Sequence, residues 1–62
     1  MVQFIDRVTG AAVYINPEYV MSIRPHPADP DNASIVKIRD GETIEVKYSH
    51  TEVVRKLLRR AA

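Results

Sequence analysis

The chain has 62 residues, no cysteine, two histidines and a formal net charge of +1, because nine basic side chains nearly balance eight acidic ones. So short a chain folds as one domain, and its small core has no disulfide to staple it. The short length, the lack of cysteine, the two histidines and the lack of a glycine-rich phosphate loop argue against a self-contained enzyme. We expect neither cofactor nor metal.

Without a disulfide or a metal site, oligomerisation is the remaining way to add stability to so small a core. The sequence therefore favours a homo-oligomer. No apolar run approaches the roughly 18 residues that a transmembrane helix needs, and the N-terminus lacks the pattern of a signal peptide. We expect a cytoplasmic protein without membrane insertion.

The first expected element is a hairpin that turns at Thr9-Gly10. A two-residue turn there pairs Phe4 with Ile15 and Ile5 with Tyr14, so both faces of the hairpin carry apolar residues. Two interpretations are open: either the strands are covered on both sides within the monomer, or Ile5 and Tyr14 belong to a subunit contact.

Asn16-Pro17-Glu18 predicts a single helical turn, because asparagine is a favoured capping residue and proline presets φ. The segment from Val20 to Arg24 then predicts a short strand with Met21 and Ile23 on one side. Pro25 ends that strand.

Residues 25–33 are rich in proline and show no apolar periodicity, which predicts an exposed loop. His26, Asp29 and Asp31 offer nitrogen and oxygen ligands, but their spacing matches no metal-ligand motif. Ordinary turn chemistry explains such a cluster, and we therefore predict a solvated loop.

A clear alternation of apolar and polar residues from Ser34 to Tyr48 predicts a second hairpin with one buried face. A two-residue loop would set apolar residues against polar ones, because directly opposed residues share a face. An odd loop repairs this, either Asp40–Glu42 or Arg39–Gly41 with Gly41 left-handed in a bulge. Direct pairing of Arg39 with Glu42 would contradict the argument.

Ser49 and Glu52 form a capping box that begins a helix over residues 49–61. Its predicted apolar stripe, which should lie across the buried face of the sheet, consists of Val53, Val54, Leu57, Leu58 and Ala61. The fold class is therefore α+β: a small antiparallel sheet of four to five strands with one C-terminal amphipathic helix packed on it, in a single domain.

The titratable side chains give no catalytic arrangement. His50 falls in the first helical turn, where we expect an exposed side chain and not a catalytic one. Asp40, Glu42 and Glu45 belong to the hairpin turn and its polar face, where solvation explains them.

One group of cations could contact a partner, and it consists of Arg55, Lys56, Arg59 and Arg60. These side chains could follow a phosphate backbone or an acidic protein surface. Alternatively they form a solvated helix face that complements the helix dipole. No aromatic residue lies among them, so base stacking is not indicated.

Motifs along nearly the whole chain resemble the FlbD/SwrD family of small bacterial flagellar proteins. They are Arg7-x-x-Gly10, the segment Tyr14–Val20 with its Asn16-Pro17, the hairpin with Asp40-Gly41, and Ser49-x-x-Glu52-Val53-Val54. The resemblance implies a non-enzymatic cytoplasmic accessory factor for flagellar motor function and swarming, with no catalytic residues. The central loop is longer than in that family.

We therefore expect a protein–protein interaction module. Its expected interaction surface comprises Ile5, Tyr14, Tyr19, Lys37, Arg39 and Lys47. The alternative is a nucleic-acid-binding regulatory protein that uses the basic helix face, because the hairpin and capped helix also resemble part of the LytTR DNA-binding domain.

Overall fold

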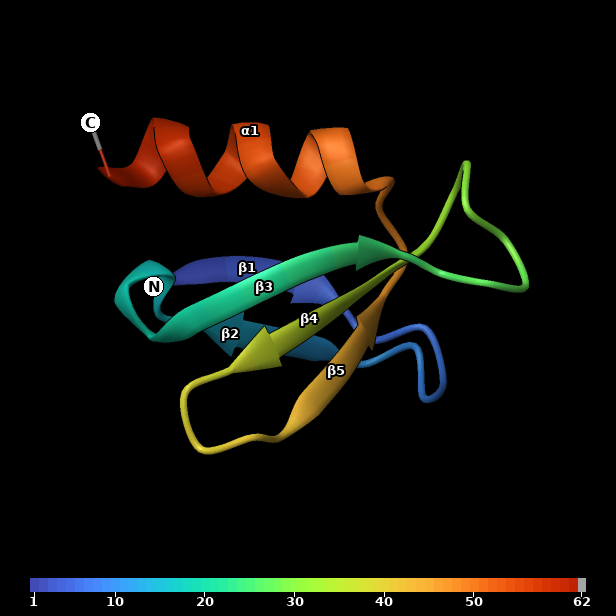
Figure 1. Cartoon of the computed structure of the whole chain (residues 1–62), viewed down its shortest axis with the longest axis horizontal. Coiled ribbons are helices and arrows are strands. Elements are labelled where there is room, and N and C mark those ends of the chain that lie inside the picture. The colour runs from blue at the N-terminus through green and yellow to red at the C-terminus, as the bar shows by residue number, and fades with distance from the viewer. Residues whose placement is uncertain (62) are drawn as a thin grey trace.

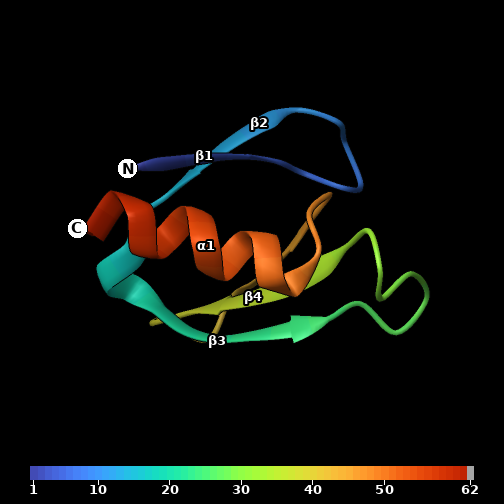
Figure 2. The same cartoon turned by 90° about the horizontal axis from the view of Figure 1, so that it is seen from above.

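The computed structural model describes the backbone of residues 1–61 and the side chains of residues 1–58. The elements are β1 (Val2–Ile5), β2 (Ala12–Ile15), the 3₁₀ turn η1 (Pro17–Tyr19), β3 (Val20–Pro25), β4 (Ser34–Ile38), β5 (Thr43–Val46) and α1 (His50–Ala61). The helix lies over the strands, with the β1-β2 hairpin on one side of it and β3 on the other (Figures 1 and 2).

The α+β class with antiparallel strands and one C-terminal helix is confirmed, but the predicted single sheet of four or five strands is not. The strands form a two-stranded sheet, β1-β2, and a three-stranded sheet, β3-β4-β5. The two sheets meet at one antiparallel bridge between Asp6 and Val46. Beside it the Arg7 N–H donates to the Glu45 carbonyl at 2.8 Å, and the Lys47 N–H donates to the Ile5 carbonyl at 3.0 Å.

The core fills the space between the two sheets and the helix. Its buried members are Val2, Phe4, Ile15, Val36, Val46, Val53 and Leu57. Phe4 is fully buried, and its ring meets Tyr48 edge-on, with 5.6 Å between the ring centroids. Each sheet therefore places alternate side chains against the helix, as expected for strands with one covered face.

The β4-β5 hairpin confirms the predicted odd loop. Val36 pairs with Ile44 and Lys37 with Thr43, and the Ile38 N–H donates to the Glu42 carbonyl at 2.9 Å. The loop is therefore Arg39–Gly41, one of the two odd loops that the alternation allowed. This register puts Val36 and Ile44 on the core face together.

Gly41 closes this loop with φ of 92°, a left-handed conformation that L side chains avoid. Nothing lies within 4 Å of where a Cβ would be, so only the backbone would resist a side chain. Gly41→Ala should lower the free energy of unfolding by about 1–2 kcal/mol, whereas Gly41→Asn should cost less. Chemical denaturation of both variants measures this, and an alanine variant as stable as the native protein would contradict the turn geometry.

The β1-β2 hairpin differs from its predicted register. Phe4 pairs with Val13, not with Ile15, which pairs with Val2 instead. The turn is longer than two residues because the Asp6 carboxylate accepts from the Val8 and Thr9 amides, at 2.7 and 3.1 Å. The register shift is even, so each side chain keeps the face that the sequence assigned to it.

The prediction that Met21 and Ile23 share a side of β3 is wrong. Val20 pairs with Ile38 and Ser22 with Lys37, so one extra residue, Met21, is inserted on β3. This β-bulge lets Val20 and Ile23 both pack on the core, although they are three residues apart. Met21 is left 66% exposed.

The Asn16 cap is confirmed, because its side chain accepts from the Glu18 amide at 3.0 Å at the start of η1. At the start of α1, the Ser49 hydroxyl accepts from the Glu52 amide at 3.4 Å, so this half of the predicted capping box is present. Glu52 itself is exposed.

The predicted helix stripe is too wide. Val53 and Leu57 are buried, but Val54 is 40% and Leu58 65% exposed. The helix is oriented about its axis so that Lys56, three residues after Val53, also faces the strands. Ala61, the last predicted member, lies outside the described side chains.

Candidate functional site

An apolar groove runs between the end of β2, η1 and the β4-β5 hairpin. Two adjoining hollows share Tyr19 and Ile38, and the residues that define this tyrosine groove are Met1, Tyr14, Tyr19, Ile38 and Ile44. Tyr14 is 60% and Tyr19 49% exposed, and both present a large ring to solvent.

The groove is open because of where the β4-β5 hairpin turns. Val36 and Val46 are fully buried, whereas Ile38 and Ile44, nearer the turn, are only half-buried. Figure 1 shows this turn reaching away from the helix. The same apolar face thus changes from core to surface along one hairpin.

Few charges border the tyrosine groove. Arg39 and Asp40, on the hairpin turn, line the hollow beside Tyr19 and Ile38. Asn16 adds an amide at the other end, next to the buried Ile15. An apolar floor with a small polar rim is the arrangement found in the centre of protein–protein interfaces.

The structure brings together only part of the interaction surface that the sequence predicted. Tyr14, Tyr19 and Arg39 border the tyrosine groove. Ile5 is half-buried, and its carbonyl accepts the hydrogen bond that joins β1 to the segment after β5. Met1, Ile38 and Ile44 were missed, because alternation assigned the two isoleucines to the core and nothing marked Met1.

The two predicted lysines lie apart from the groove. Lys37 lines a different hollow with Ser22, Arg24, Ile35 and Thr43. Lys47 lines a third with Arg7, Asp29 and Asn32. The predicted surface therefore divides into the tyrosine groove and a polar sheet face.

The basic cluster of the helix is also divided. Arg55 is exposed, but Lys56 is half-buried and its Nζ lies 5.0 Å from the Tyr48 ring centroid and 5.6 Å from that of Phe4. A cation in this position is attracted by both rings. Lys56 is thus held against the core, and the side chains of Arg59 and Arg60 lie outside the described residues.

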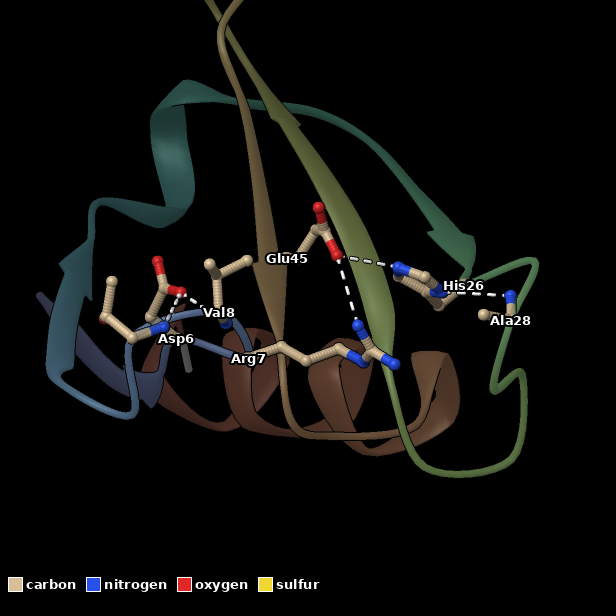
Figure 3. A network of polar contacts seen from close by, with 7 residues as sticks. Asp6, Arg7, Val8, His26, Ala28 and Glu45 are labelled. Atoms are coloured by element: carbon tan, nitrogen blue, oxygen red, sulfur yellow. Dashed lines mark hydrogen bonds and ion pairs between the residues drawn. The ribbon is translucent and has the colours of Figure 1, made fainter.

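His26 and Glu45 form a contact that the sequence did not reveal. The His26 Nε2 lies 2.7 Å from Glu45 Oε1, and its Nδ1 accepts from the Ala28 amide at 3.0 Å (Figure 3). Arg7 Nη1 lies 3.6 Å from the same Glu45 oxygen. The side chain of His26 is only 11% exposed, so it is not the solvated loop residue predicted. Nineteen residues separate the pair, beyond the reach of local motifs.

This contact fixes the loop of residues 26–33 to β5. We expect Glu45→Ala to speed amide exchange in that loop, whereas the free energy of unfolding falls by less than about 1 kcal/mol, because the carboxylate is over a third exposed. Hydrogen exchange followed by NMR measures both. Glu45→Gln keeps an acceptor for His26 and should keep the loop protected; equal loosening in both variants would contradict the hydrogen-bond account.

Among the described residues, no group of three or more His, Asp or Glu side chains could hold a metal ion. No helix in that part of the chain is long and apolar enough to span a membrane. Comparison with family models, curated proteins and solved structures finds no match to this chain.

Proposed function

We propose that this chain is a small non-enzymatic protein–protein interaction module that binds its partner through the tyrosine groove. The observation that carries the proposal is the pair of exposed tyrosines over an apolar floor of Ile38 and Ile44. Tyrosine is enriched in the binding hot spots of interfaces, because its ring buries a large apolar area and its hydroxyl still finds a polar partner.

The partner chemistry follows from the rim. A partner needs apolar side chains for the floor and a carboxylate or carbonyl within reach of Arg39. Association driven by such a surface survives high salt, since apolar burial is not screened by ions.

The biological setting of this proposal is that of an accessory protein for bacterial flagellar motility. It is supported by the resemblance of Arg7-x-x-Gly10, Asn16-Pro17 and Ser49-x-x-Glu52 to the FlbD/SwrD pattern. The proposal includes a cytoplasmic location, which the lack of cysteine fits.

Nucleic-acid binding has less support. Within the described part of α1, the exposed member of the basic cluster is Arg55, while Lys56 is drawn toward two rings. Fluorescence anisotropy with mixed DNA and RNA oligonucleotides tests this directly. Phosphate-driven binding would be tight at roughly 50 mM salt and weaker by orders of magnitude at 200 mM.

The proposal is tested by affinity capture from extracts of cells that carry the protein, washed at about 0.5 M salt. The tagged native protein should retain a partner that Tyr19→Asp loses. Met21→Asp is the matched control, because Met21 is also exposed, at 66% against 49% for Tyr19, but lies outside the groove. Retention of the partner by Tyr19→Asp, with circular dichroism showing a native fold, would refute the groove as the binding surface.

A further inference from the structure

The edge strands β3 and β2 differ in the features that discourage pairing with a further strand. The β3 edge carries a bulge at Met21, a charge at Arg24 and a proline at Pro25. Each of these features is known to discourage strand pairing. The β2 edge, Ala12–Ile15, contains no charge, no proline and no bulge.

The pairing of β2 with β1 shows which N–H and C=O groups of β2 face outward. The Asp6 N–H donates to the Ala11 carbonyl at 2.8 Å, so this pair is hydrogen-bonded. Hydrogen-bonded and non-hydrogen-bonded pairs alternate in an antiparallel ladder, so Val13 bonds toward β1. The N–H and C=O groups of Ala12 and Tyr14 therefore point away from β1, and no other strand of the described chain pairs with them.

We propose that β2 pairs antiparallel with β2 of a second copy of this chain, about a two-fold axis at Val13. Ala12 then lies opposite the partner's Tyr14, and Tyr14 lies opposite the partner's Ala12. Each of these two pairs exchanges two hydrogen bonds, so all the outward groups of Ala12 and Tyr14 are used. The two hairpins become one continuous sheet across the dimer.

A second copy fits this edge because the edge is complementary to itself. The small Ala12 leaves room for the large partner ring of Tyr14, which is 60% exposed in the single chain. No like charges meet at the two-fold axis, because residues 12–15 are all uncharged. Two-fold dimers with isologous contacts are the commonest homo-oligomers. Such a dimer also gives the small, disulfide-free core the support that its size calls for.

This inference goes beyond the proposed function, because the dimer can form whether or not the tyrosine groove binds another protein. Tyr14 borders that groove, and the two-fold axis therefore places two grooves near each other. A dimer would present its partner with two sites, which raises the overall strength of binding.

Disulfide trapping tests the register. The chain has no cysteine, so Val13→Cys carries a single thiol per chain. The two-fold axis sets position 13 opposite itself in a non-hydrogen-bonded pair with Cα atoms about 4.5 Å apart. That separation allows a disulfide. Mild oxidation should convert most of the Val13→Cys protein to a covalent dimer, and Met21→Cys on the β3 edge should stay largely uncoupled.

Sedimentation of the unmodified protein is the second measurement. It should give twice the mass of the chain at high concentration, and Ala12→Pro should give one chain mass, since that variant removes an outward N–H and no bond to β1. A single chain mass for the native protein at roughly 1 mM, or equal coupling of Val13→Cys and Met21→Cys, would overturn the inference. Tyr19→Asp should leave Val13→Cys coupling unchanged, which separates this test from that of the groove.

Discussion

Phe4→Ala will remove a large share of the free energy of unfolding. Phe4 is completely buried and touches Tyr48 and Lys56, so its loss removes a large apolar side chain and opens a cavity. Such a change lowers the free energy of unfolding by about 3–5 kcal/mol, whereas the whole free energy of unfolding of a 62-residue domain is roughly 3–9 kcal/mol. Urea titration followed by circular dichroism measures the loss.

Tyr14→Ala is the matched control for Phe4→Ala. It also truncates an aromatic ring of the β1-β2 hairpin, but that ring lies on the exposed face. Its free energy of unfolding at low protein concentration should change by under about 1 kcal/mol. If the two variants lose equal stability, the faces of the hairpin are wrongly assigned.

The second large effect distinguishes two adjacent leucines of α1. Leu57 is 8% exposed and belongs to the core, while Leu58 is 65% exposed. Leu57→Ala should lower the free energy of unfolding by about 2–5 kcal/mol. Leu58→Ala should change it by about 0.5 kcal/mol or less.

Both leucine variants keep the same helix propensity, because each replaces leucine with alanine within one turn. The difference between them therefore reports docking alone. Thermal unfolding of the pair in parallel measures it, and a larger loss from Leu58→Ala would mean that the helix presents its other side to the strands.

The sequence predicted the β4-β5 hairpin well because most of its apolar residues fall on one face, with Ile35 as the exception. Alternation on both sides of Gly41 left two odd loops, and the structure has the one that gives Gly41 a positive φ. The Asn16 and Ser49 caps were equally predictable, since each acts on an amide two or three residues away.

The remaining elements depend on contacts that no local pattern encodes. Both faces of the β1-β2 hairpin carry apolar residues, so periodicity could not choose its register. The bulge at Met21 exists because Val20 and Ile23 both reach the core, which a strand of period two cannot arrange. In α1 the apolar residues come in adjacent pairs, so the sequence could not show which member of each pair faces the strands. The contact of Lys56 with Phe4 shows how the helix is turned about its own axis.

Only part of the candidate site could be predicted from the sequence, because the exposure of some of its residues depends on the fold. One of the two open interpretations put Ile5 and Tyr14 in a subunit contact, and on that face Tyr14 is exposed whereas Ile5 is half-buried. Ile38 and Ile44 have the pattern of core residues, and only the length of the hairpin beyond the core exposes them. The His26–Glu45 contact needed the fold, because two loops and a strand bring it together.

The most direct test of the central claim is an NMR titration of the ¹⁵N-labelled protein with the partner captured at high salt. We predict that amide shifts concentrate at Tyr14, Tyr19, Ile38 and Ile44, around the tyrosine groove. Shifts confined to the helix around Arg55, with the groove unchanged, would contradict the account and assign binding to the basic face.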